Sequence, residues 1–148
     1  GGTSADMGNA VFVAAMLELP TMAFFSKMSE KINCGTLIKF SILMFCVKHA
    51  LTYFATNMIM IYLAQVCQMF AYALFIPASV YYVNEKIALA DRVKGQSLVT
   101  TSMTLSGVFA NFAGGIMLDA LGVGHVLLAG IILSIVGAVI VILTTEKV

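Results

Sequence analysis

Glu18 is an ionisable residue inside a stretch of the sequence that is otherwise apolar. It lies two residues before Pro20, and a proline within a helix cannot donate its backbone hydrogen bond and clashes with the carbonyl four residues earlier, here that of Met16. The helix is therefore expected to bend and to leave a backbone acceptor free. A carboxyl group at such a bend is a candidate proton or cation site, although a structural ion pair would explain it equally well.

Lys48 is a second charged residue within an apolar stretch, and His49 follows it. A charge in the middle of a spanning helix costs roughly 2.5 to 3.5 kcal/mol on insertion scales, so such residues are expected to face a protein interior or a water-filled cavity. Lys48 is the natural partner of Glu18, or it binds an anionic or hydroxylated substrate directly. His49 lies about 100° around the helix from Lys48, so the two side chains cannot point at the same place.

Polar side chains recur on one face of the next apolar stretch. Gln65 and Gln68 are three residues apart, and Tyr72 continues the same stripe. Amide and phenol groups on one helical face indicate one of two arrangements. They line a polar cavity that recognises hydroxyls or amides, or they make hydrogen bonds between helices without any ligand.

A further apolar stretch contains small residues at intervals of four, namely Gly107, Asn111 and Gly115. Small residues at this spacing let helices approach closely, so the pattern favours a packing face. Asn111 is the one member of this face whose side chain could contact a ligand.

Composition places these residues in a membrane protein. The chain has 148 residues, of which 61% are hydrophobic and only 10% are charged. Soluble domains have roughly 25% charged residues, and too few remain here to cover the outside of a soluble fold. The net charge of +1 argues against nucleic acid as a partner. The cysteines form no CxxC pair and no HExxH or nucleophile–base pattern is present, so we expect no metal, no cofactor and no enzyme activity.

The apolar stretches have the length of membrane-spanning helices, which need about 20 mostly apolar residues. They are too long for strands and do not alternate polar with apolar residues. The sequence therefore predicts an all-α, polytopic bundle of about five spanning helices, in one partial transmembrane domain over residues 1–148. The predicted helices cover residues 7–25, 36–54, 58–83, 96–118 and 125–143, and residues 119–124 form the last linker.

Basic residues divide the linkers into two sets. The N-terminal segment and the second and fourth linkers contain none, whereas the first and third linkers with their flanks, and the tail, contain Lys27, Lys31, Lys39, Lys86, Arg92, Lys94 and Lys147. The positive-inside rule then predicts a multi-pass protein of the plasma or inner membrane, with its N-terminus outside and its C-terminus in the cytoplasm. At about 1.5 Å per residue, Glu18 lies roughly 12 Å and Lys48 roughly 18 Å from the cytoplasmic ends, a difference that the lysine stem can span.

Residues 114–122, with the sequence GGIMLDALG, and the earlier Arg92 and Gly95-Gln96 are similar to segments of a known family. They look like the end and the beginning of the eleventh span of a major facilitator superfamily transporter. The alternation of long basic linkers with short outer ones fits the same family. The chain thus resembles the C-terminal half of such a transporter, spans eight to twelve.

Within this superfamily the chain is most similar to the branch that contains lactose permease and the nucleoside–proton symporters. Three positions depart from the lactose permease pattern: Lys48 replaces an arginine, Gln68 replaces a histidine, and Ala71 replaces the proton-carrying glutamate. The relay of the sugar symporter is therefore not present in that form. The Glu-Leu-Pro that begins at Glu18 resembles a feature of the wider branch, and Glu18 is expected to carry the charge instead.

The resemblance implies a fragment of a secondary active transporter whose partners are the lipid bilayer and a missing N-terminal half. A small polar solute, sugar-like or nucleoside-like, would bind near the midplane between two six-helix halves that rock in alternating access, coupled to protons. A drug or metabolite exporter of the same fold and a non-transporting membrane scaffold subunit are the alternatives. The expected coupling residues are Glu18 and Lys48, and the expected cavity residues are Gln65, Gln68, Tyr72 and Asn111.

Overall fold

The computed structural model of the chain describes residues 3–146, and the long regular elements within them are all α-helices. Each of these helices is long and apolar enough to cross a membrane. The prediction of an all-α bundle with about five spanning helices is confirmed. The helices are α1 (Ser4–Ser29), α2 (Cys34–Tyr53), α3 (Met58–Lys86), α4 (Arg92–Leu121) and α5 (Val123–Thr144), and a short 3-10 turn, η1 (Leu89–Asp91), precedes α4.

Local capping sets where several helices begin. The Thr3 hydroxyl accepts a hydrogen bond from the backbone nitrogen of Asp6, and the Asp6 carboxylate accepts one from the backbone nitrogen of Thr3, which together form a capping box. The Asn57 side chain accepts from the backbone nitrogen of Met60 at the start of α3. The helices also extend a few residues beyond the apolar runs, because backbone hydrogen bonding continues through the polar residues at the membrane boundary.

The last linker is much shorter than the sequence suggested. Residues 119–124 were expected to form it, but α4 continues to Leu121 and α5 begins at Val123, so Gly122 alone separates them. Gly122 has a φ of 81°, a conformation that glycine adopts without steric cost. A single residue can therefore reverse the chain, and the predicted linker is wrong in extent.

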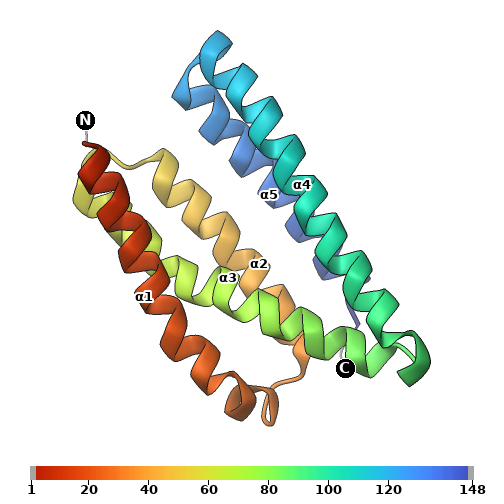
Figure 1. The fold of residues 1–148 in the computed structure, drawn as a ribbon. Helices are drawn as coiled ribbons and strands as arrows, with labels where there is room; N and C mark the ends of the chain where they lie inside the picture. Colours follow the sequence, from red (N-terminus) through yellow and green to blue (C-terminus); the bar gives the residue numbers. More distant parts are fainter. Residues whose placement is uncertain (1–2, 147–148) are drawn as a thin grey trace.

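α3 is the central helix of the bundle. It packs along both α1 and α2, and α2 packs on its other side against α5 (Figure 1). Fully buried alanines at intervals of seven, Ala64, Ala71 and Ala78, allow the neighbouring helices to approach α3 closely. Leu74 lies between them and contributes to a hydrophobic cluster with Phe25 of α1. The three helices α1, α2 and α3 thus form the compact part of the structure.

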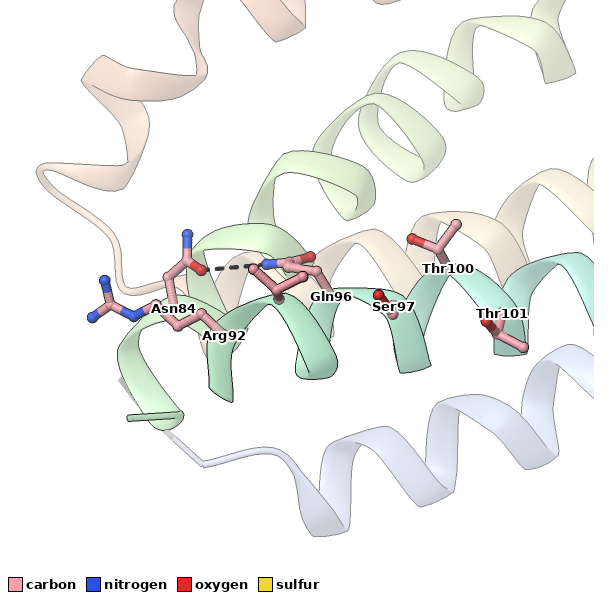
Figure 2. A pocket seen from close by; sticks show the side chains of 7 residues that line it. Asn84, Arg92, Gln96, Ser97, Thr100 and Thr101 are labelled. Atoms are coloured by element: carbon pink, nitrogen blue, oxygen red, sulfur yellow. Dashed lines mark hydrogen bonds between the residues drawn. The ribbon is translucent and has the colours of Figure 1, made fainter. Parts of the chain in front are cut away.

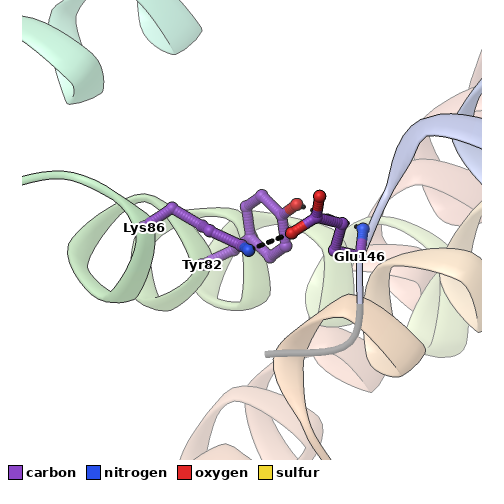
Figure 3. Close-up of polar contacts among 3 residues, drawn as sticks. All are labelled: Tyr82, Lys86 and Glu146. Atoms are coloured by element: carbon purple, nitrogen blue, oxygen red, sulfur yellow. Dashed lines mark hydrogen bonds and ion pairs between the residues drawn. The ribbon is translucent and has the colours of Figure 1, made fainter.

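The two ends of the bundle differ in which segments they contain. The N-terminus, the α2–α3 linker and the α4–α5 turn lie at one end, and the other linkers and the C-terminus lie at the opposite end (Figure 1). At that opposite end Lys86 forms an ion pair with Glu146, whose backbone nitrogen donates to the Tyr82 hydroxyl at 3.3 Å (Figure 3). The hydrogen bond from Lys86 lowers the pKa of the Glu146 carboxyl, so this contact weakens as the pH falls through that pKa.

Within residues 3–146 α4 contacts both α3 and α5, and its closest packing on α3 is at Gly95. Gly95 is its buried residue, and a Cβ added there would come within 2.5 Å of Ile87 Cδ1 and 2.9 Å of Val83 Cγ1. At Gly107 and Gly115 an added Cβ would meet no atom within 4 Å. The small residues of α4 were expected to be a packing face, and this face has no partner within residues 3–146.

Replacing Gly95 with alanine is expected to destabilise the contact between α3 and α4. Overpacking of a close contact costs about 1–3 kcal/mol, so thermal unfolding of the intact protein in detergent should occur at a lower temperature. Gly114→Ala is the matched control, because an added Cβ at this position of the same helix meets nothing within 4 Å. An equal effect of the two substitutions would contradict close packing at Gly95.

Candidate functional site

A chain of hydrogen bonds joins three helices in the membrane-spanning part of the bundle. Gln68 on α3 donates from its Nε2 to Oε1 of Glu18 on α1, at 3.0 Å. Lys48 on α2 donates from its Nζ to Oε1 of the same glutamine, at 2.5 Å. The side chains of all three residues are half-buried. The structure therefore brings together three of the residues that the sequence singled out.

The Gln68 amide is matched to the charges on either side of it. Its carbonyl oxygen faces the ammonium and its NH₂ group faces the carboxylate, so each charged group receives a charge-assisted hydrogen bond. Glu18 and Lys48 form no ion pair within 4.0 Å in the part of the chain that the structure describes. The expected partnership of Glu18 and Lys48 is thus indirect, with Gln68 between them.

Small residues on α3 make room for this chain. Ala64 and Ala71 lie four residues before and three residues after Gln68, and both are fully buried. Their small size lets α1 and α2 come near enough for Glu18 and Lys48 to reach one amide. At Ala71 a methyl group packs between helices.

His49 points to a different part of the bundle. Its Nδ1 lies 2.8 Å from the Phe45 carbonyl oxygen of its own helix. Its ring contacts α5 at Gly130, where an added Cβ would lie 3.3 Å from His49 Cδ2. This agrees with the helical geometry, which separates His49 from Lys48 by about 100°.

A cavity of about 650 Å³ lies between α2, α3 and α4, and Tyr72 is among the residues that line it. Tyr72 is one helical turn from Gln68, and Phe45 is one turn from Lys48, so this cavity adjoins the hydrogen-bond chain. Phe45 and Phe75 meet edge to face, with ring centroids 6.3 Å apart. Its lining residues are Ile42, Phe45, Tyr72, Phe75, Leu98, Val99, Ser102, Met103 and Ser106.

Sequence reasoning missed most of these lining residues. Phenylalanines in an apolar run have the same pattern whether they face lipid or a cavity, so nothing distinguished Phe45 and Phe75. Ser102 and Ser106 are four residues apart on one face of α4, and this spacing could have suggested a hydroxyl-bearing wall.

The remaining predicted cavity residues lie elsewhere. Gln65 lines a separate cavity of about 520 Å³ near the N-terminal ends of α1 and α3, together with Thr3 and Met58. Asn111 is exposed and donates to the Gly107 carbonyl oxygen of its own helix at 2.8 Å. The stripe of Gln65, Gln68 and Tyr72 is therefore divided among three environments.

A further cavity lies at the other end of the bundle, where α3 ends and α4 begins (Figure 2). Its volume is about 490 Å³, and most of the side chains around it are polar. The residues that line it are Asn84, Arg92, Val93, Gln96, Ser97, Thr100 and Thr101.

Metal ligands do not cluster in residues 3–146, where no group of three or more His, Cys, Asp or Glu side chains could hold a metal ion. The cysteines Cys34, Cys46 and Cys67 are free thiols, and Cys46 donates to the Ser134 carbonyl oxygen at 3.3 Å.

Substituting Gln68 with leucine is expected to leave two half-buried charges without their shared partner. Loss of hydrogen bonds to charged groups costs about 1.5–3 kcal/mol, which thermal unfolding of the intact protein in detergent should detect. Gln65→Leu serves as the control, because Gln65 lies on the same helix outside the hydrogen-bond chain. If both variants unfolded at the same temperature, the bridging role of Gln68 would be wrong.

Comparison with known proteins places the chain in a family. No curated protein and no solved structure matches the chain significantly. The family model of the Major Facilitator Superfamily matches residues 1–148, the whole length of the sequence. The five apolar helices are consistent with a partial fold of this family. The chain therefore belongs to the Major Facilitator Superfamily, a family of membrane transporters.

Proposed function

We propose that the chain is part of a secondary active transporter that couples a small polar solute to protons by alternating access. The observation that supports this most directly is the hydrogen-bond chain from Glu18 through Gln68 to Lys48, which crosses three helices. In this proposal Glu18 binds and releases the proton. The hydrogen bond from Gln68 to Glu18 depends on the charge of Glu18, and the hydrogen bond from Lys48 to Gln68 changes with it.

Protonation of Glu18 changes the hydrogen bonds along this chain. A neutral carboxyl group is a weaker acceptor than a carboxylate, and charge-assisted hydrogen bonds are roughly twice as strong as neutral ones. The Gln68 amide is then held less firmly, and its carbonyl oxygen is free to turn away from the Lys48 ammonium. Because each residue lies on a different helix, a proton on Glu18 alters how α1, α2 and α3 are held together.

The solute would bind in the cavity beside Tyr72. Its volume of about 650 Å³ lies within the range of small-molecule sites. Aromatic rings from Phe45, Tyr72 and Phe75 can contact the ring of a sugar or nucleoside, and the hydroxyls of Ser102 and Ser106 can hydrogen-bond to it. The hydrogen bonds of the adjacent Gln68 amide would then depend both on the bound solute and on the protonation of Glu18.

A second half of the transporter would cover α4. Asn111 and the small residues beside it are exposed, and they lie on a face that has no partner within residues 3–146. Such an open polar face is costly in lipid, whereas a facing half would bury it and complete a cavity that includes Asn111. Gln65, which lies near the N-terminal ends of α1 and α3, would line the outer part of the same path. We therefore infer that the chain forms spans eight to twelve, in the branch of lactose permease and the nucleoside–proton symporters.

The charges of the linkers support one orientation in the plasma or inner membrane. Lys27, Lys31, Lys86, Arg92 and Lys94 lie toward the end that contains the α1–α2 and α3–α4 linkers. This end would face the cytoplasm under the positive-inside rule. The N-terminus of the segment then lies outside.

Glu18→Gln in the intact transporter tests the proton-coupling role. Uptake of the transported solute into proteoliposomes should depend on an imposed pH gradient in the wild type and lose this dependence in the variant, because glutamine cannot exchange a proton. Glu30→Gln is the control, since Glu30 is exposed in the α1–α2 linker. Unchanged coupling in Glu18→Gln would remove Glu18 from the mechanism, and full activity after neutralising both Glu18 and Lys48 would favour a purely structural pair.

The segment alone is expected to be inactive. Alternating access needs two halves that move against each other around the site, and this chain supplies five helices. Liposomes that contain only residues 1–148 should therefore show no solute uptake above that of protein-free liposomes. Uptake by the segment would contradict the proposal that a second half completes the path.

A further inference from the structure

The cavity at the junction of α3 and α4 lies at the level of the membrane boundary. α3 ends at Lys86 and α4 begins at Arg92, so the cavity between them is situated where spanning helices meet the lipid headgroups. Gly95 fixes this junction, because its lack of a side chain lets the first turns of α4 lie against Val83 and Ile87. The cavity is therefore built by close packing of two helices.

Arg92 supplies a positive charge to this cavity. Its Nε donates to the Ile87 carbonyl oxygen at 3.4 Å, which leaves the two terminal nitrogens of the guanidinium available. Lys86 and Lys94, the other basic residues of this junction, are paired with carboxylates. Arg92 has no carboxylate within 4.0 Å among residues 3–146.

The Asn84 amide offers a second donor at the same end of the cavity. Gln96 donates from its Nε2 to the Val80 carbonyl oxygen at 2.9 Å and to Oδ1 of Asn84 at 3.5 Å. This contact engages the oxygen of the Asn84 amide and leaves its NH₂ group free to donate. Figure 2 shows that this nitrogen and the Arg92 guanidinium lie at the same end of the cavity. Two donors, one of them charged, therefore lie at the end of the cavity where an anion can bind.

Hydroxyl groups extend the cavity along α4. Ser97 lies three residues before Thr100 and four before Thr101, so it is a neighbour of both on the helix surface, and all three line the cavity. The row runs about 6 Å along the helix axis, away from the end at which Arg92 lies. A free phosphate would use the donors at one end only, whereas a phospholipid also has ester oxygens that can accept from hydroxyls farther along.

We propose that this cavity binds the phosphate of an anionic phospholipid headgroup. Basic pockets between spanning helices at the cytoplasmic side are known to bind such headgroups. Arg92 and Asn84 would donate to the phosphate oxygens, and the hydroxyls of α4 would hydrogen-bond to the glycerol and ester region. The acidic neighbours in sequence, Glu85 beside Asn84 and Asp91 beside Arg92, do not line the cavity. The proposal requires that the chain spans a membrane and that the facing half proposed above leaves the start of α4 uncovered, and it does not depend on the solute or on proton coupling.

Lipid binding to the intact protein in detergent micelles tests this site. Native mass spectrometry would compare phosphatidylglycerol with phosphatidylcholine for the wild type and for Arg92→Gln, Asn84→Ala and Lys94→Gln. Loss of a charged hydrogen bond should weaken phosphatidylglycerol binding about tenfold in Arg92→Gln. Lys94→Gln removes the same charge from the same turn of α4 but lies outside the cavity, so it should change binding by less than about twofold. Asn84→Ala should have an intermediate effect.

One further variant and one competitor distinguish a lipid headgroup from free phosphate. Arg92→Lys keeps the charge but loses the two-pronged guanidinium, so it should restore only part of the binding. Inorganic phosphate, added as a competitor, identifies the source of the anion. Weak competition supports a lipid headgroup, and full displacement at comparable concentration shows a site for free phosphate and overturns the lipid assignment. Equal losses in Arg92→Gln and Lys94→Gln, or equal binding of phosphatidylcholine, would overturn the site altogether.

Discussion

The bundle depends on how it accommodates two opposite charges among apolar helices. A charged side chain in the middle of a membrane needs polar groups around it, because hydrocarbon offers no hydrogen bonds. Here one amide serves both charges: the Gln68 oxygen accepts from Lys48 and its NH₂ group donates to Glu18. A direct ion pair would fix two helices to each other, whereas this arrangement fixes α1 and α2 to the central helix α3. The neutral amide is also easier to release than an opposite charge would be, since its hydrogen bonds rearrange without leaving a new charge unpaired.

Packing around α3 makes the hydrogen-bond chain through Gln68 possible and limits it to one turn of that helix. The alanines that recur every seven residues bring α1 and α2 against α3, and the long side chains of Glu18 and Lys48 then need to extend only to one turn of that helix. Farther along α3, Leu74 belongs to a hydrophobic core with Phe25. The polar chain and this core therefore lie at different levels along α3. A larger residue at Ala71 would separate the helices and disturb both.

The helices could be predicted from the sequence, because length and apolar composition alone distinguish a spanning helix. The sequence also identified Glu18, Lys48 and Gln68 as candidate site residues, since charged and amide groups are conspicuous in apolar runs. The order of these residues in the hydrogen-bond chain could not be predicted. It depends on which side of α3 faces each neighbouring helix, and this is set by packing between helices that are far apart in sequence. For the same reason Gln65 and Tyr72, although on one stripe, contact different cavities. The turn at Gly122 was misjudged because the preceding residues, including Asp119, are compatible with both a loop and a helix end.

The structure divides into a compact part and an attached pair of helices, and the cavities follow that division. α1, α2 and α3 pack tightly, whereas α4 lies close to them at Gly95 and is otherwise exposed along its length. The cavity beside Tyr72 and the one beside Arg92 both have α4 as a wall. A helix that packs closely on α3 near one end can change its distance from α3 along the rest with little loss of buried contact. Because Gln68 lies in the tightly packed part and the hydroxyls of Ser102 and Ser106 lie on α4, a solute between them would bridge a rigid surface and a movable one. In the proposed mechanism, binding of the solute would therefore alter the position of the whole helix.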